Sequence, residues 1–322
     1  MWYFIFLANV EVFKGIVYRS TGSWYLVKGD NGEFKECRIK GKIRLKGLKT
    51  TNPISVGDTV EFHEEEDCGV IREILPRTNY IIRKSVNLSK QAHIIASNMD
   101  QAMLVVTLGS PQTSTGFIDR FLITAEAYSI PVVLVFNKID LCSEKDTETL
   151  AELIDVYEQI GYKCIITSAK QKINIEAVAD LLKDKTTMLS GHSGAGKSSL
   201  INEIQPDLTL KTGEVSDAHF KGKHTTTFAE MFDLEMGGRI IDTPGIKGFG
   251  LLDIEKNELG HYFPEIAERM NDCKFNNCVH VNEPHCAIKS AVEEGHIGVS
   301  RFDSYISMYF DDEAENFRTP DY

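Results

Sequence analysis

Residues 191–198 read Gly191-His192-Ser193-Gly194-Ala195-Gly196-Lys197-Ser198, which fits the pattern G-x-x-x-x-G-K-[ST] without deviation. An apolar run at residues 187–189 precedes the pattern, and a helical segment is expected from Ser199 onward. A strand, a glycine-rich loop and a helix in this order form a phosphate-binding loop, because backbone N–H groups and the helix N-terminus face the phosphates. We predict that Lys197 reaches the β- and γ-phosphates and that Ser198 holds Mg²⁺.

A second motif, Asn137-Lys138-Ile139-Asp140, follows an apolar run at residues 132–136. This N-K-x-D tetrad is typical of a guanine-binding loop. The Asp140 carboxylate can accept from the base N1–H and from the exocyclic amine, a pair of donors that adenine does not offer. We predict that Asn137 contacts the other edge of the base and ties down neighbouring loops, and that Lys138 lies along the base plane.

A third motif, Ser168-Ala169-Lys170, ends the next apolar run and resembles the supporting guanine loop of GTPases. The backbone amide of Ala169 is expected to meet the base carbonyl. The S-A-K triplet is weak evidence alone. Together with N-K-x-D and the phosphate-binding loop, it predicts a protein that binds and hydrolyses GTP.

A fourth motif, Asp242-Thr243-Pro244-Gly245, follows the apolar run at residues 239–241. We predict that Asp242 binds Mg²⁺ through water and that the Gly245 amide bonds the γ-phosphate. Hydrolysis would then release this loop.

The loop at residues 222–227, Gly-Lys-His-Thr-Thr-Thr, lies between the phosphate-binding loop and D-x-x-G. Thr226 is our candidate to complete the Mg²⁺ shell, with Thr225 as the alternative; a plain polar surface loop is the competing interpretation. Ras-type enzymes place a water-orienting Gln just after D-x-x-G, but Ile246 stands there and cannot hydrogen-bond. His224 is therefore the candidate catalytic residue, unless it is only a loop residue.

The order of these motifs differs from that of a Ras-like GTPase, because N-K-x-D and S-A-K precede the phosphate-binding loop. Circular permutation produces this order when the old termini are joined and new ones are opened. The helix expected at residues 175–182 would make that join. D-x-x-G then leads directly into the C-terminal region, so that nucleotide state would move that region.

The rest of the chain predicts three kinds of structure. Apolar runs at residues 103–107, 132–136, 162–167 and 187–189 alternate with helical segments at 118–128, 147–160 and 175–182, which indicates a doubly wound α/β fold. Residues 10–80 alternate in short strands with turns, as in a small all-β barrel of the OB-fold type. Seven basic residues against one acidic residue at 35–49 favour RNA binding, with a solvated basic loop as the alternative.

Composition sets further limits. The 322-residue chain has a net charge of −12, which excludes a globally cationic nucleic-acid binder. The apolar start at Met1–Ala8 lacks a basic region and a cleavage site, so a buried strand is favoured over a signal peptide. No run reaches the roughly 18 apolar residues that span a bilayer, so no membrane partner is expected. Seven cysteines, three of them clustered, indicate a reducing cytoplasm and a metal site.

The clustered cysteines have the spacing of a zinc site. Cys273, Cys278, His280 and Cys286 supply three thiolates and one imidazole, a complete tetrahedral set for one structural Zn²⁺. His285 is a competing ligand, although its adjacency to Cys286 makes joint ligation awkward. The alternative is a set of reduced cysteines in a small core.

These motifs resemble those of the ribosome small subunit-dependent GTPase A (RsgA) family. The resemblance covers G-x-S-G-x-G-K-S-S-L-I-N, G-K-H-T-T-T, D-T-P-G-I-K-x-F-G and C-x₄-C-x-H-x₅-C, then E-P-H-C-A-I-K-x-A-V-E-x-G and R-F-x-S-Y. It implies an N-terminal OB-fold, a circularly permuted P-loop GTPase domain and a mainly helical zinc-binding domain, here placed at residues 1–80, 81–252 and 253–322. It also implies a bacterial cytoplasmic factor that binds the small ribosomal subunit late in its maturation and hydrolyses GTP faster when bound.

We expect a monomer that uses GTP or GDP, Mg²⁺ and one Zn²⁺, with the small ribosomal subunit and its rRNA as partners. Two rivals remain, namely a GTPase of another RNA-related pathway and an RNA-binding module with a weak nucleotide site. The predicted catalytic residues are His224, Lys197 and Thr226. The predicted nucleotide-binding residues are Asn137, Lys138, Asp140, Ser168, Ala169, Lys170, Gly191, His192, Ser193, Gly194, Ala195, Gly196, Lys197, Ser198, Ser199, Asp242 and Gly245. The predicted metal ligands are Cys273, Cys278, His280 and Cys286 for zinc, and Ser198 and Thr226 for magnesium.

Overall fold

The computed structural model describes residues 11–40, 52–65, 67–84, 92–208, 210, 229–243 and 254–310. They belong to two compact units. The first comprises residues 1–100, 182–188 and 221–244, and the second comprises residues 101–181, 189–220 and 245–322. The strand β11 (Thr186–Ser190) carries the chain from the first unit into the second.

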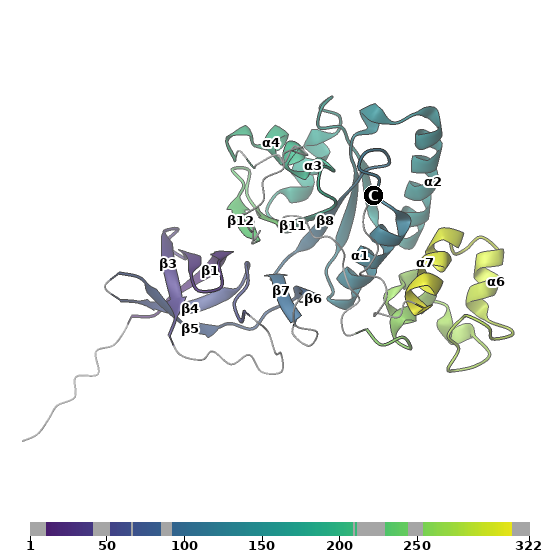
Figure 1. Cartoon of the computed structure of the whole chain (residues 1–322), viewed down its shortest axis with the longest axis horizontal. Coiled ribbons are helices and arrows are strands. Elements are labelled where there is room, and N and C mark those ends of the chain that lie inside the picture. The colour runs from purple at the N-terminus through teal and green to yellow at the C-terminus, as the bar shows by residue number, and fades with distance from the viewer. Residues whose placement is uncertain are drawn as a thin grey trace, which may run out of the picture. The chain divides into compact units, whose positions relative to one another are not determined.

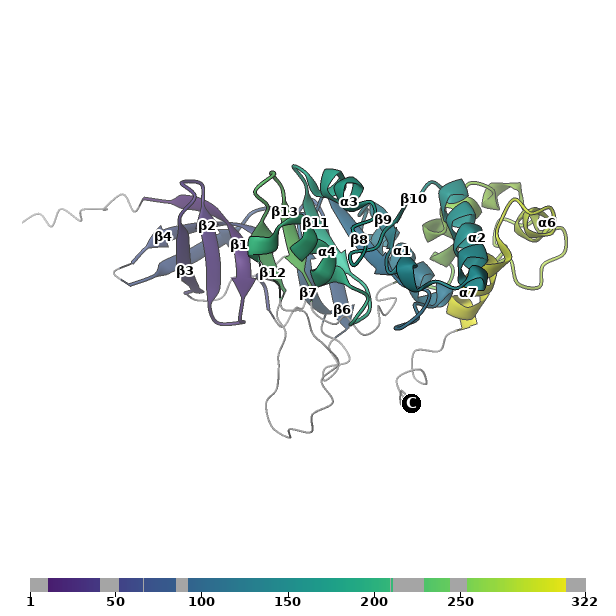
Figure 2. The same cartoon turned by 90° about the horizontal axis from the view of Figure 1, so that it is seen from above.

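The first unit contains a five-stranded barrel. Its strands follow the order β1-β2-β3-β5-β4, and β4 also pairs with β1, which closes the sheet. The β3–β5 pair is parallel and the other pairs are antiparallel. This is the OB-fold arrangement expected from the sequence, and Figure 2 shows β1, β2 and β3 side by side. The strands are β1 (Phe13–Ser20), β2 (Tyr25–Gly29), β3 (Phe34–Ile39), β4 (Thr59–Glu64) and β5 (Gly69–Ile74).

Alternate side chains of these strands fill the barrel, as the period of two requires. Cys37 is fully buried there, and burial raises the pKa of its thiol to about 12. It is therefore an inert core residue rather than a reactive thiol. The barrel core consists of Val17, Tyr25, Val27, Cys37, Ile54, Val60, Phe62 and Ile71.

Four further strands belong to the first unit, of which three were not predicted. The hairpin of β6 (Tyr80–Lys84) and β7 (Ala92–Ser97) forms its own sheet. The strand β12 (Glu230–Asp233) pairs with β1 on one side and with the predicted β13 (Arg239–Asp242) on the other. Strands this short take their stability from partners distant in sequence, so local pattern alone did not reveal them.

The second unit contains the parallel sheet that the sequence predicts. Its strands β8 (Gln101–Val106), β9 (Val132–Phe136) and β10 (Lys163–Ile166) pair in the order β10-β9-β8. Every residue of β8 and β9 is buried, as in a strand covered on both faces. The predicted helices are confirmed as α1 (Thr115–Ala127), α2 (Glu144–Ile160) and α3 (Ile175–Leu182), and α4 (Lys197–Ile204) follows the phosphate-binding loop (Figure 1).

The described part of the C-terminal region is mainly helical and has its own apolar cluster in the second unit. Its helices are α5 (Pro264–Ala267), α6 (Ala287–Glu293) and α7 (Val299–Phe310). Ile123 of α1 belongs to this cluster, and α7 packs against α1. The region therefore shares a core with helix α1 of the α/β fold.

A buried ion triad fastens this region to α1. Arg301 of α7 donates from one terminal nitrogen to Asp119 of α1 at 2.6 Å and from Nε to Glu265 of α5 at 2.7 Å. The side chains of Arg301 and Asp119 are fully buried, and Tyr157 also donates to Asp119 at 2.9 Å. Charges removed from water at this depth are tolerated only when they are paired and hydrogen-bonded.

The N-terminal strand predicted at Met1–Ala8 lies outside the described residues, and so do residues 41–49 of the basic stretch. Among the described residues, no helix is long and apolar enough to cross a membrane.

We predict that replacing Arg301 with Leu destabilises the protein by about 3–5 kcal/mol, because two buried carboxylates lose their cation. The loss is measured from the shift of the urea midpoint in far-ultraviolet circular dichroism. Arg269→Leu is the control, since Arg269 forms a surface pair with Glu268 and its loss should cost less than about 1 kcal/mol. Equal effects of the two substitutions would show that the triad adds nothing.

Candidate functional site

Three predicted loops meet in the second unit. The buried side chain of Asn137 donates from Nδ2 to the Ala195 carbonyl at 2.9 Å, and its Oδ1 accepts from the Ala169 backbone N–H at 3.2 Å. Asn137 thus joins the N-K-x-D, phosphate-binding and S-A-K loops. The sequence analysis predicted this contact between Asn137 and neighbouring loops. The Asp140 carboxylate lies beside the third loop and accepts from Ser168 Oγ at 2.6 Å.

Close backbone approach shapes the phosphate-binding loop. Gly196 has φ of +97°, and a Cβ there would lie 2.2 Å from Asn137 Nδ2, so only glycine fits. A Cβ on Gly191 would likewise lie 2.4 Å from the Val105 carbonyl oxygen. The Lys197 ammonium folds over this loop and donates to the carbonyls of Gly191 at 2.7 Å and His192 at 3.0 Å. The lysine therefore lies where phosphate oxygens would be cradled.

The helix α1 supports the same loop from the side. The rings of Phe117 and His192 lie 4.1 Å apart between centroids and 32° from parallel. Burial, with the nearby Lys197 charge, lowers the pKa of His192, which keeps its imidazole neutral at pH 7. The Lys138 ammonium donates to the Ser110 carbonyl, in the loop that leads into α1, at 2.9 Å.

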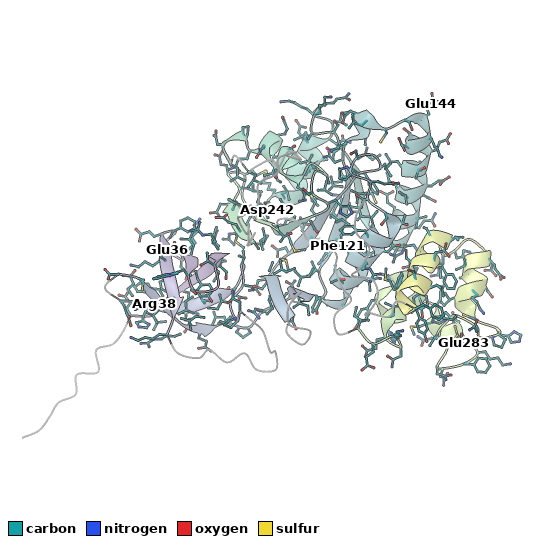
Figure 3. The ribbon with its side chains drawn as sticks, viewed as in Figure 1. Glu36, Arg38, Phe121, Glu144, Asp242 and Glu283 are labelled. Atoms are coloured by element: carbon teal, nitrogen blue, oxygen red, sulfur yellow. The ribbon has the colours of Figure 1, made fainter. Side chains whose placement is uncertain are left out.

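The remaining nucleotide-site predictions fall into two groups. Ser193 and Ser199 are exposed and Ser198 is half-buried at the start of α4, while Lys170 is exposed beyond the buried Ala169. Asp242 ends β13 in the first unit (Figure 3). The candidates that lie outside the described residues are His224, Thr225, Thr226, Gly245 and Ile246.

The metal-site prediction brings four side chains together. The ligand atoms of Cys273, Cys278, His280 and Cys286 all lie within 4.8 Å of one another. Tetrahedral zinc bonds of about 2.3 Å to sulfur and 2.0–2.1 Å to nitrogen imply edges of about 3.8 Å between sulfurs and 3.6 Å between sulfur and nitrogen. The edges are 3.9 Å for Cys273–Cys286 and 3.6 Å for Cys273–His280. The residues therefore fit a closed zinc site.

His280 rather than His285 joins this group. His280 is 1% exposed, and its Nδ1 lies 3.4 Å from Cys286 Sγ, whereas His285 is exposed and outside the cluster. Among the described residues, the imidazole of the metal site thus belongs to His280, the histidine that the sequence spacing of the ligands favours.

A carboxylate to which the sequence analysis assigned no role organises the metal loop. Glu283 accepts from the backbone N–H groups of Val279 at 2.9 Å, Val281 at 3.0 Å and Asn282 at 3.1 Å. Although burial opposes it, these hydrogen bonds lower the pKa of Glu283. Tyr305 of α7 holds the same loop from outside by donating to the Val279 carbonyl at 2.9 Å. Figure 3 shows Glu283 among the C-terminal elements.

The overlooked residues had different signals. Glu283 was detectable as an acidic residue in the tight turn between two ligands, where a carboxylate often caps backbone N–H groups. Phe117 had no local signal, because its partner lies 75 residues away in the chain. Arg301 opens the quoted R-F-x-S-Y stretch, but its partner Asp119 lies 182 residues away, so no role could be assigned to it.

A parallel sheet whose N-K-x-D and S-A-K loops precede the phosphate-binding loop in the chain defines a circularly permuted P-loop GTPase. A model of the RsgA N-terminal domain matches residues 14–71, and a model of the RsgA GTPase matches residues 74–252. The chain belongs to the RsgA family of GTPases.

Known proteins are similar in sequence to this chain over nearly its whole length. The small ribosomal subunit biogenesis GTPase RsgA of Christiangramia forsetii is 56% identical over 313 residues, which cover 96% of this chain and 99% of that protein. The protein of the same name from Flavobacterium johnsoniae is 53% identical over 312 residues, with 96% of each chain covered.

Two solved structures have the same fold. The crystal structure of YjeQ from Thermotoga maritima matches with a TM-score of 0.76 at 38% identity and covers 93% of this chain and 98% of that one. The structure of YloQ, described as a circularly permuted GTPase, matches with a TM-score of 0.71 at 31% identity and covers 98% and 99%.

We predict that Glu283→Gln weakens zinc binding by about 10–100-fold, the usual cost of removing a residue that orients metal ligands. The amide supplies only one acceptor oxygen for three backbone N–H groups. Competition with a chromogenic zinc chelator measures the affinity. Glu293→Gln is the control, since Glu293 is exposed at the end of α6. Zinc affinity equal to that of the parent would contradict this role for Glu283.

Proposed function

We propose that this chain is a GTPase of small ribosomal subunit biogenesis, which binds that subunit and hydrolyses GTP to GDP and phosphate faster when bound. The observation that carries the proposal is the junction of three loops at Asn137, which holds a guanine-selective loop against a phosphate-binding loop. The names of relatives at 53% and 56% identity supply the ribosomal partner.

Guanine selection is assigned to Asp140, with the Ala169 amide on the base carbonyl. Oδ1 of Asp140 accepts from Ser168, and Oδ2 has no hydrogen-bond partner among the described residues. The bond from Ser168 holds the carboxylate in place, so its second oxygen and remaining lone pairs are available to the N1–H and exocyclic amine of guanine. The half-buried position of Asp140 strengthens these bonds relative to bonds in open water.

Phosphate binding is assigned to the backbone of residues 191–198 and to Lys197. The Lys197 ammonium exchanges its two carbonyl acceptors for β- and γ-phosphate oxygens. Mg²⁺, when bound, neutralises charge that develops on the phosphates, and Ser198, Thr226 and, through water, Asp242 would hold it. His224 is proposed to orient the attacking water, because Ile246 has no hydrogen-bonding group.

Slow turnover without a partner follows from this assignment. Because Ile246 cannot orient the attacking water, turnover without a partner is expected to be slow, and a partner that positions the orienting group would accelerate the reaction. We propose that the small subunit and its rRNA are that partner, that the barrel and the zinc-binding region make the contacts, and that the protein acts as a monomer.

We predict that Asp140→Asn weakens GTP binding by at least about 100-fold and strengthens binding of xanthosine triphosphate. Each hydrogen bond to the charged carboxylate contributes about 1.5–3 kcal/mol, and every 1.4 kcal/mol is tenfold in affinity. The amide instead donates to the 2-oxo group of xanthine. Calorimetric titration with both nucleotides measures the switch, and Asp155→Asn, an exposed change on α2, is the control. Undiminished GTP affinity in Asp140→Asn would refute the guanine assignment.

The proposed function itself is tested by phosphate release with and without purified small ribosomal subunits. We expect small subunits, but not large ones, to raise the rate at least about tenfold in the parent. Lys197→Ala should remove both rates, since the phosphates lose their cation. A parental rate that small subunits leave unchanged would overturn the ribosomal assignment.

A further inference from the structure

The outer face of the barrel has a depression of about 450 Å³ beside the β1–β2 turn. It is bordered by β1, β2 and β3, by the β1–β2 turn and by the β4–β5 turn. In OB-folds, the face of strands 2 and 3 and the loops between strands 1 and 2 and between 4 and 5 bind oligonucleotides or oligosaccharides. The depression lies on that surface. Its lining residues are Arg19, Thr21, Trp24, Leu26, Glu36 and Asp67.

An exposed aromatic ring on a hydrogen-bonded turn forms one side of the depression. Trp24 is 45% exposed, although a tryptophan of this size is normally well covered. Its backbone is held by Thr21, whose N–H donates to the Trp24 carbonyl at 2.9 Å and whose Oγ1 accepts from the Trp24 N–H at 3.3 Å. Within the described chain, the indole N–H has no hydrogen-bond partner. An exposed ring on a fixed turn is ready to stack, with little ordering needed on binding.

The polar rim offers more acceptors than donors. Asp67, on the β4–β5 turn, is exposed and has no hydrogen bond or ion pair within the part of the chain that is described. Glu36 projects from β3 (Figure 3) and lies 3.4 Å from Arg19. A carboxylate such as that of Asp67 can accept from an exocyclic amine, as Asp and Glu do from cytosine N4. Uracil offers carbonyl oxygens there and would be repelled.

The charges of the depression do not favour the nucleic-acid backbone. One cation, Arg19, faces two carboxylates, and its guanidinium is already shared between Glu36 at 3.4 Å and Glu230 at 3.7 Å. Phosphates are therefore not the main ligand. Stacking on an aromatic ring contributes about 1–3 kcal/mol per base, which is enough to hold one base without strong charge attraction.

We propose that Trp24, Asp67 and Arg19 form a binding site for one unpaired nucleobase with an exocyclic amine, stacked on the indole with its amine on Asp67. The inference rests on the proposed ribosomal function, because rRNA supplies such bases, and it goes further by assigning the site and its base preference. Arg19 contacts at most one phosphate, so affinity falls only weakly with salt, with a logarithmic slope of about −0.7.

The chain provides its own probe. It has two tryptophans, Trp2 and Trp24, so Trp2→Phe leaves Trp24 as the single tryptophan of the full-length protein, which can be excited selectively over tyrosine. Short single-stranded oligo-cytidine is expected to quench this fluorescence at concentrations at least about tenfold lower than oligo-uridine. Quenching that is absent with every oligonucleotide, or equal for cytidine and uridine, overturns the proposal.

Substitutions then test each group, with the anisotropy of labelled oligo-cytidine as the readout. Trp24→Ala should weaken binding by about tenfold, whereas Trp24→Phe keeps a ring and most of the affinity. Asp67→Asn should remove most of the preference for cytidine over uridine. Phe34→Ala is the matched control, because Phe34 is 50% exposed on β3 but outside the depression. Equal binding by Trp24→Ala and the parent would refute the site.

Two other results have defined meanings. If ribosomal proteins change Trp24 fluorescence and no oligonucleotide does, the surface binds protein and the proposal fails. Failure of the proposed function would look different, since the parental protein would then show no stimulation of GTP hydrolysis by small subunits. A normal stimulation together with no base binding rejects only the Trp24 site.

Discussion

The side chain of Asn137 is the constraint on which the nucleotide site depends. Its amide accepts from Ala169 and donates to Ala195, so one buried group fixes loops that are 32 and 58 residues away in the chain. Both bonds are shielded from water, and loss of either would leave a buried polar atom unpaired at a cost of about 1–3 kcal/mol. Gly196 must then lack a side chain, because the Asn137 amide occupies the place of its Cβ. The positions of the three loops and the need for glycine at residue 196 thus both follow from the hydrogen bonds of Asn137.

Circular permutation leaves the contacts of Asn137 intact but changes the order in which the chain connects the surrounding elements. The helix α1 illustrates the result, since its first turn stacks Phe117 on His192 while Asp119, two residues later, pairs with Arg301 of α7. From α7, Tyr305 reaches the metal loop at Val279. Phosphate-binding loop and metal loop are therefore joined through two helices within one compact unit. Such a path is a physical means for one site to bias the other, although coupling requires a second arrangement of these contacts.

Local pattern predicted the parts of the molecule whose cause is local. The apolar runs at residues 103–106 and 132–136 predicted buried parallel strands, and the spacing of Cys273, Cys278, His280 and Cys286 predicted a tetrahedral site. The start of α4 was missed by two residues, because Gly196 in the left-handed region lets the helix begin at Lys197. The strand β12 and the Arg301 triad were missed entirely. Both are stabilised by residues that lie far away in the chain, so a short stretch of sequence does not reveal them.

The described part of the basic stretch at residues 35–49 is paired with carboxylates. The sequence interpretation relied on the basic stretch at residues 35–49, yet Lys35 pairs with Glu64 at 3.0 Å, and Arg38 and Lys40 pair with Glu65 at 3.3 and 2.8 Å. The bond from Lys40 lowers the pKa of Glu65, so this carboxylate stays ionised near neutral pH. Exposed pairs of this kind contribute about 0–1 kcal/mol each, and phosphates can displace them cheaply. For these three described cations the net attraction to phosphate is therefore reduced. The exposed ring of Trp24 is a group that can contribute to RNA binding without net charge.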